Sequence, residues 1–226
     1  IELPQHMFMS IAMFLAQNEQ EPNKIALEFY EVLSKFEAMC ATPTLANART
    51  TKHQLSSCYI GSTPDNIEGI FDSYKEMALL SKYGGGIGWD FSLVRSIGSY
   101  IDGHKNASAG TIPFLKIAND VAIAVDQLGT RKGAIAVYLE IWHIDVMEFI
   151  DLRKNSGDER RRAHDLFPAL WVCDLFLKRV LEDAMWTLFD PYECKDLTEL
   201  YGQDFEKRYL EYEKDPKIIK EYINAC

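Results

Sequence analysis

The stretch AIAVYLEIW, residues 134–142, decides the fold class of this chain, because an apolar run of this length is typical of a buried strand. Two earlier segments also have strand character: QLSSCYIG at 54–61, which ends at a glycine, and YGGGIGWDFS at 83–92. Helical spacing of apolar residues separates these segments, over 66–82 and again from Pro113 onward. Short strands that alternate with helices predict an α/β protein built from βα units. The alternation does not separate an open sheet from a barrel.

The first 40 residues have a different character. Residues 4–18 and 22–39 each begin with a proline and place apolar residues at helical spacing, which predicts a helical hairpin. We expect helical structure to break at Thr42-Pro43, since a residue before proline avoids helical geometry. Beyond residue 143 the pattern predicts a helix, a mobile loop, a strand, a second helix and a charged helical tail, at 144–153, 153–165, 168–173, 174–184 and 191–225.

Composition argues against several classes of protein. The 226 residues include 24 Lys and Arg against 34 Asp and Glu, a net charge of −10 without a basic stretch, so binding to polymeric nucleic acid is not expected. No apolar window reaches the roughly 18–20 residues of a membrane span, and no signal peptide is visible. Five irregularly spaced cysteines argue against a secreted disulfide framework and favour a reducing, cytoplasmic location. They also lack the CxxC and Cys/His spacing of a structural zinc site.

Three features could carry chemistry, and each has an alternative explanation. The glycines at 84–86 match neither the Walker A pattern nor the dinucleotide-binding context. They form either a tight turn, which the cluster alone favours, or a backbone that a ligand can approach closely. Cys58 is either a buried, inert thiol or an exposed, reactive one, and the sequence does not choose. His143 is interpreted as a hydrogen-bonded histidine at a strand end and not as a metal ligand.

Three groups of residues, in order along the chain, resemble the large catalytic subunit of ribonucleotide reductase. They are PTLANART with QLSSCYI, then GGGIGWDFSLVRSIGS, and then AGTIPFLKIANDVAIAVDQLGTRKGAIAVYLEIWH, within 43–60, 84–99 and 109–143. The resemblance runs from about Leu3 through the tail. It implies an N-terminal helical region at 1–40, followed at 41–226 by roughly the first half of a ten-stranded α/β barrel. The chain would then be truncated or split before the family's finger loop.

Members of this family reduce ribonucleoside diphosphates to 2′-deoxyribonucleotides, the precursors of DNA, by thiyl-radical chemistry that oxidises a pair of cysteines. The resemblance implies that Cys58 is one of that pair and not the radical cysteine. Thr42 and Ser57 match residues that contact the substrate phosphates or ribose, and Gly86 matches a glycine close to the substrate. Hydroxyl and backbone N–H groups can hold a diphosphate without a Walker loop.

The family also binds nucleotide effectors, dNTP or ATP, at a specificity site in its dimer interface. The residues that match this site are Asp65, Asn66, Ile67, Arg95 and Asp102. Arg95 would be a phosphate ligand, a role suited to a guanidinium fork. Asp65 would accept hydrogen bonds from the effector sugar or base, and it is also the predicted N-cap of the helix at 66–82. Asp102 stands where some members carry arginine.

The sequence matches the second specificity loop of the family but not its radical-cysteine motif. Gln127 and Arg131 match the readers of a second specificity loop. The radical cysteine of the family, however, lies in an Asn-x-Cys-x-Glu motif that this sequence lacks. Asn224 and Cys226 have the first spacing of that motif without its Glu, and we interpret Cys226 as a helix residue or as the point of interruption. We therefore expect the chain to be inactive alone and to need its missing C-terminal half.

The resemblance also implies partners. They are a second large subunit in a homodimer, thioredoxin or glutaredoxin, the nucleotide substrate, and a metal-containing small subunit that supplies the radical, with adenosylcobalamin as the alternative source. No metal or cofactor is expected within this chain. Two other interpretations stay open: a non-catalytic nucleotide-binding or dimerisation fragment with only the effector site, and an unrelated α/β metabolic enzyme in which Cys58 has no role.

Overall fold

The computed structural model describes residues 2–51, 53–125 and 133–225. Its centre is a parallel sheet in which the strands neighbour each other in chain order. The strands are β1 (Cys58–Ser62), β2 (Gly86–Asp90), β3 (Ile135–Glu140) and β4 (Leu166–Trp171). The predicted α/β class and all of these strands are confirmed, although their limits shift by a few residues. The shifts arise because only the residues that join the ladder of hydrogen bonds count as strand, whereas the apolar pattern extends into the flanking turns.

Parallel pairing sets the register of the sheet. Cys58 pairs with Gly86, Ile87 pairs with Ile135, and Ile135 pairs with Leu166. Because side chains alternate between the two sides of a strand, this register places every second residue of each strand on the same side. We call the side that carries Cys58 the open face, since its opposite side is covered by helices.

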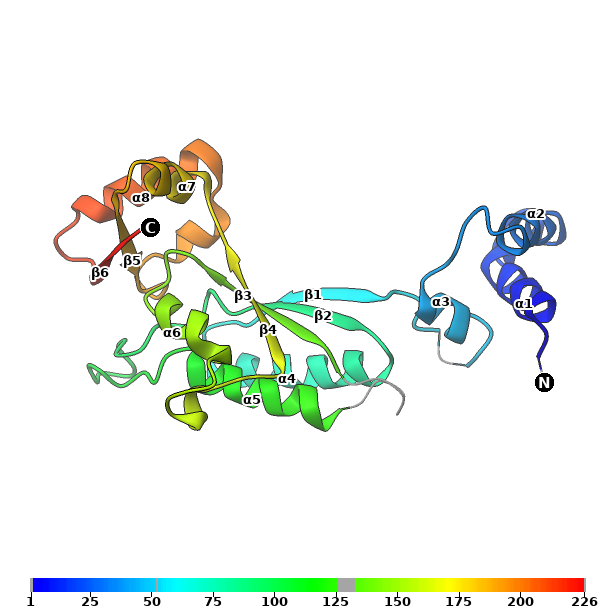
Figure 1. The fold of residues 1–226 in the computed structure, drawn as a ribbon, viewed down its shortest axis with the longest axis horizontal. Coiled ribbons are helices and arrows are strands. Elements are labelled where there is room, and N and C mark those ends of the chain that lie inside the picture. The colour runs from blue at the N-terminus through cyan, green and yellow to red at the C-terminus, as the bar shows by residue number, and fades with distance from the viewer. Residues whose placement is uncertain (1, 52, 126–132, 226) are drawn as a thin grey trace.

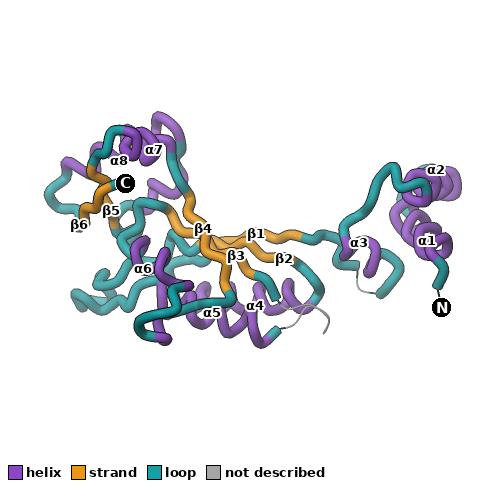
Figure 2. Tube along the Cα trace, viewed as in Figure 1, coloured by secondary structure: helices purple, strands orange, loops and turns teal. Residues whose placement is uncertain are grey.

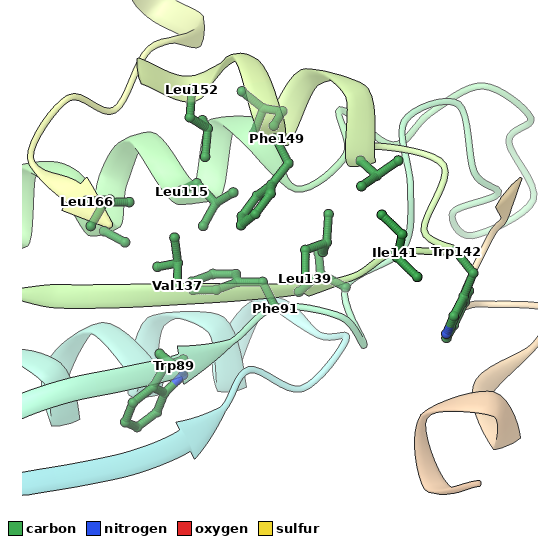
Figure 3. Close-up of a cluster of buried hydrophobic side chains, with 14 of the residues drawn as sticks. Trp89, Phe91, Leu115, Val137, Leu139, Ile141, Trp142, Phe149, Leu152 and Leu166 are labelled. Atoms are coloured by element: carbon green, nitrogen blue, oxygen red, sulfur yellow. The ribbon is translucent and has the colours of Figure 1, made fainter. Parts of the chain in front are cut away.

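The covered face holds the main hydrophobic core. Helices α4 (Ile67–Lys82) and α5 (Ile112–Ala124) lie along this side of the sheet (Figures 1 and 2). In the close-up of Figure 3, Leu115 of α5 and Phe149 of α6 (Val146–Ile150) point toward strand β3. Full burial of one such side chain stabilises the fold by about 1.5–3 kcal/mol, so this layer holds sheet and helices together.

The start of α4 corrects one prediction. Asp65 is not the N-cap of this helix. Asn66 takes that position with extended backbone, and its Oδ1 accepts the Gly69 N–H at 2.8 Å. The Asp65 carboxylate is instead engaged by Arg95, a residue of the loop after β2. A tertiary contact therefore decides which of two adjacent capping residues acts as the cap.

That loop, between β2 and α5, is irregular as predicted and is tied to the body of the protein by Asp145. The buried Asp145 carboxylate accepts the backbone N–H of Ile97 at 2.9 Å and that of Thr111 at 2.7 Å. A Cβ at Gly110, which has φ of 77°, would lie 2.6 Å from the same carboxylate. Glycine is therefore required there for both conformation and space.

The N-terminal region is helical, as predicted, and lies apart from the sheet in Figure 1. Helices α1 (Pro4–Ala16) and α2 (Pro22–Ser34) form the expected hairpin around a small apolar cluster of their own. Helix α2 ends earlier than predicted, and Phe36 just beyond it has a left-handed backbone with φ of 59°. The expected break before Pro43 is instead the start of α3 (Thr42–Asn47), because proline fits the first turn of a helix. Among the described residues no helix has the length and apolar character needed to span a bilayer.

The C-terminal part differs from its prediction. After α7 (Asp174–Leu181) the chain forms β5 (Met185–Phe189), and after α8 (Gly202–Lys214) it forms β6 (Lys220–Asn224), which pairs antiparallel with β5. The sequence of β6, KEYIN, is charged and largely exposed, so the strand is set by pairing with buried β5 and not by its own pattern. Cys226 lies outside the described residues, and the segment before it is a strand where we predicted a helix.

Replacing Leu139 with alanine is expected to lower the free energy of unfolding by about 2–5 kcal/mol, because truncation leaves a cavity in the core. Leu139 is fully buried, whereas Leu181 at the end of α7 is 89% exposed and makes a matched control. Leu181→Ala should change the free energy of unfolding by no more than about 0.5 kcal/mol. Chemical denaturation followed by tryptophan fluorescence measures both, and equal losses would contradict the assignment of the core.

Candidate functional site

Cys58 is an accessible thiol at the N-terminal end of the sheet. It is the first residue of β1, it is exposed, and its Sγ lies 3.7 Å from Ser57 Oγ. Gly86 lies opposite Cys58 in the ladder and donates its N–H to the Ser57 carbonyl at 2.7 Å. Three of the four predicted substrate-binding residues therefore lie together. Of the two interpretations of Cys58, the structure favours the accessible thiol over the buried one.

The structure confirms the tight turn at the glycine cluster, whereas the close approach of a ligand to its backbone stays a prediction. Gly84 has φ of 90° and makes the tight turn that leads into β2. At Gly85 a Cβ would lie 2.7 Å from the Tyr59 ring, so only glycine packs there without displacing the ring. At Gly86 a Cβ would come within 3.3 Å of the Ser57 carbonyl oxygen. The bare backbone at this last position keeps the surface beside the thiol open to a ligand.

The structure places Thr42 on a different element from the other predicted substrate residues. It is the first residue of α3, and its side chain is exposed. Within the described chain no hydrogen bond joins it to Ser57 or Cys58. Helix α3 nevertheless contacts the segment that enters β1, because Thr44 Oγ1 donates to the Leu55 carbonyl at 3.0 Å. The contact of Thr42 with substrate stays a prediction.

A cavity of about 670 Å³ lies along the open face beyond Cys58. Strand residues with the same side-chain direction as Cys58 form one wall, Tyr138 and Trp171 among them. The opposite wall is the segment 198–201, which follows β5 in the chain. The cavity thus combines aromatic surface with a few polar groups, as pockets for small molecules usually do.

The buried Glu140 and the half-buried Asp90 form an acidic pair in the wall of this cavity. Burial and the nearby Asp90 carboxylate raise the pKa of Glu140 to about 8. Burial also raises the pKa of Asp90, although the Ser92 hydroxyl donates to its carboxylate at 2.5 Å. The pair therefore holds a proton near neutral pH. Sequence reasoning missed these residues. The signal that could have identified Glu140 is the presence of an acidic residue inside the apolar run 134–142.

Asp65 and Arg95, two of the predicted effector residues, form an ion pair. The Arg95 Nε–H donates to both carboxylate oxygens at 3.0 and 3.1 Å, and Nη2 lies 3.0 Å from Oδ2. Nη1 donates to the Tyr100 carbonyl at 2.6 Å. Hydrogen bonding to Asp65 raises the pKa of Arg95 above its usual value. Among the described residues these contacts use three of the five guanidinium N–H donors, and the other two could bind an anion.

The other predicted effector residues have different surroundings. Asn66 caps α4, and Ile67 is the exposed first residue of that helix, so both adjoin the ion pair along the chain. Asp102 is exposed in a turn and has a left-handed backbone with φ of 45°. Gln127 and Arg131, the predicted readers of the second specificity loop, lie outside the described residues.

His143 is buried and both of its ring nitrogens are bonded. Nδ1 accepts the Asp145 N–H at 3.0 Å, so the proton of the neutral ring is on Nε2, which lies 2.9 Å from the Val94 carbonyl. The interpretation of His143 as a hydrogen-bonded histidine is confirmed. In the residues that the structure describes, no group of three or more His, Cys, Asp or Glu is placed to hold a metal ion.

A helical N-terminal region followed by a parallel α/β sheet is the arrangement that the resemblance implies. Residues 56–226 match the family described as "Ribonucleotide reductase, barrel domain", and residues 1–53 match "Ribonucleotide reductase, all-alpha domain". The chain therefore belongs to the ribonucleotide reductase large-subunit family. It comprises the helical N-terminal region and the first half of the α/β barrel.

Curated relatives agree with this assignment. The ribonucleoside-diphosphate reductase subunit alpha of Helicobacter pylori strain J99 is 99% identical over 225 residues, which cover 100% of this chain and 29% of that protein. The alpha subunit of Chlamydia trachomatis serovar D is 49% identical over 214 residues, 95% of this chain and 20% of that protein. The large subunit of Variola virus is 45% identical over 227 residues, 100% of this chain and 29% of that protein. The chain thus spans 20% to 29% of the length of these relatives.

Stability should fall as the pH rises from about 4.5 to about 8, because the unfolded chain loses the Glu140 proton before the folded protein does. Glu140→Gln, which resembles the protonated side chain, should remove this part of the slope and raise the unfolding temperature at pH 8. Glu28→Gln on the exposed side of α2 is the control. Thermal unfolding at pH 5, 6.5 and 8 provides the comparison, and an unchanged slope in Glu140→Gln would refute the assignment.

Proposed function

We propose that this chain is part of the catalytic subunit of a ribonucleoside-diphosphate reductase, and that Cys58 is one of the two cysteines that reduce the substrate. The observation that carries the proposal is the exposed Cys58 thiol beside the bare backbone of Gly86. The names of the relatives support the activity. The family match supports a barrel around this thiol.

The proposed chemistry balances as a two-electron reduction. Two thiols supply two electrons and two protons, the 2′-hydroxyl leaves as water, a C–H bond replaces the C–O bond, and the thiols become a disulfide. Thioredoxin or glutaredoxin then reopens the disulfide by thiol–disulfide exchange, for which the exposed position of Cys58 is suited. The second cysteine of the pair and the radical cysteine belong to the larger protein. This chain by itself is therefore inactive.

Substrate would bind at the same end of the sheet. The Ser57 hydroxyl lies next to the thiol, and Gly86 leaves room for the ribose or its phosphates. Thr42 would contribute a further hydroxyl from α3. These neutral donors suit a diphosphate that is not held by a Walker loop.

Nucleotide effectors, dNTP or ATP, would bind around the Asp65–Arg95 pair. The two remaining guanidinium donors of Arg95 are suited to a phosphate oxygen. Asp65 would still accept from the sugar or base, since a carboxylate oxygen has more than one lone pair. The free N–H groups where α4 begins favour negative charge as well. The nearby side chains assigned to this site are Asn66, Ile67 and Asp102, with Gln127 and Arg131 of the second loop as readers.

The whole protein would work as a homodimer in the cytoplasm, with its radical supplied by a metal-containing small subunit or, alternatively, by adenosylcobalamin. Joining this chain to its C-terminal half distinguishes the proposal from a non-catalytic role limited to effector binding or dimerisation. Nucleotide reduction should be restored only if the chain is part of the enzyme.

Cys58→Ser in the full-length subunit is expected to abolish turnover with thioredoxin as the reductant, because a hydroxyl cannot form the disulfide. Cys40→Ser is the control, since this partly buried thiol lies in the helical region. Reduction of a ribonucleoside diphosphate measures the effect, and thiol mapping during turnover reports the disulfide. If Cys58 never enters a disulfide, the proposed function is wrong at its centre.

Arg95→Ala is expected to weaken binding of a deoxynucleoside triphosphate about 10- to 100-fold, the loss of hydrogen bonds to a charged group. The control is Arg160→Ala, because Arg160 pairs with Asp158 through the same Nε contact at 3.0 Å but on an exposed loop. Equilibrium binding of dTTP to the full-length subunit measures both. Wild-type affinity in Arg95→Ala would show that Arg95 does not bind the effector.

A further inference from the structure

The backbone that carries Arg95 is held by three aspartates from three different parts of the chain. The contacts are Arg95 N–H to Asp65 at 3.0 Å, Ser96 N–H to Asp190 at 3.1 Å, and Ile97 N–H to Asp145 at 2.9 Å. Each of three consecutive N–H groups thus has its own carboxylate. Hydrogen bonds with a charged acceptor are about twice as strong as neutral ones, so this part of the loop is rigid.

Asp190 lies in the turn that follows β5 and connects this turn to the loop of Arg95. The Asp190 carboxylate, in a residue that is 2% exposed, accepts the N–H of Tyr192 at 3.1 Å as well as that of Ser96. One buried carboxylate therefore fixes the position of Tyr192 relative to the loop of Arg95. The two segments are far apart in the sequence, and only the tertiary fold brings them together.

The Tyr192 ring lies against the Arg95 guanidinium, whose Cζ is 4.6 Å from the ring centroid. Tyrosine faces attract cations, and the planar guanidinium also stacks on aromatic rings. Asp65 and the Tyr100 carbonyl hold the guanidinium by its N–H groups. The Tyr192 ring contacts the face of the guanidinium. Among the described residues, the Arg95 side chain is therefore restrained on every side except that of its two remaining N–H donors.

We propose that Tyr192 is a positioning residue for effector binding, because it orients Arg95 before the nucleotide arrives. This inference rests on the proposed role of Arg95 as a phosphate ligand. An arginine side chain that is free in solution loses rotamer entropy on binding, and a ring that orders it beforehand reduces that loss. Tyr192 itself need not contact the nucleotide.

The test uses the full-length subunit with dTTP as the probe. Tyr192→Leu removes the aromatic face and should raise the dissociation constant about three- to tenfold, the range of a cation–π contact. Tyr192→Phe keeps the ring and should bind nearly as well as the wild type. Tyr222→Leu, which removes an exposed tyrosine of β6, is the matched control and should leave the dissociation constant unchanged.

A double-mutant cycle separates positioning from a general loss of structure. If Tyr192 acts through Arg95, then Tyr192→Leu should add no further loss to Arg95→Ala. An equal loss from Tyr192→Leu in both backgrounds would overturn the positioning role, as would wild-type affinity in Tyr192→Leu when Arg95→Ala is weakened. Wild-type affinity in Arg95→Ala itself would instead overturn the proposed effector site, so the two failures are distinguishable.

Discussion

The parallel register of β1 against β2 is the constraint on which the rest of the structure depends. A slip of one residue would exchange the two sides of a strand, turning Cys58 into the core and Tyr59 toward the open face. The slip is prevented because it would bring Ile60 or Ser62 opposite Trp89 in place of Gly61, where a Cβ would lie 2.5 Å from the Trp89 ring. The exposure of the thiol is therefore a consequence of core packing and not of any property of the cysteine.

A second constraint acts at the other end of the strands, where carboxylates organise the loop after β2. Asp65, Asp145 and Asp190 come from the start of a helix, from a turn before a helix and from the end of a strand. Asp190 and Asp145 are nearly fully buried, and a buried carboxylate is stable only when hydrogen bonds satisfy it. The loop therefore supplies the N–H groups that these aspartates need, and the aspartates give the loop one conformation.

Local pattern was sufficient for the four parallel strands and the helices between them, since each has a buried side that imposes its period on the sequence. It was insufficient for β6, whose residues are mostly exposed and which exists through its pairing with β5. Part of the candidate site was likewise predictable from the sequence and part was not. The resemblance pointed to Ser57, Cys58 and Gly86, of which the first two are adjacent in the chain. Glu140 and Tyr192 were missed because their significance comes from residues distant in sequence.

The sequence by itself determined the α/β class and the family, because periodic burial and ordered motifs are local properties of a chain. Only the tertiary structure decided that Asn66 and not Asp65 caps α4, that Asp65 pairs with Arg95, and that burial beside Asp90 raises the pKa of Glu140. These outcomes depend on electrostatic and hydrogen-bond contacts between separate segments, which exist only after the core has brought those segments together.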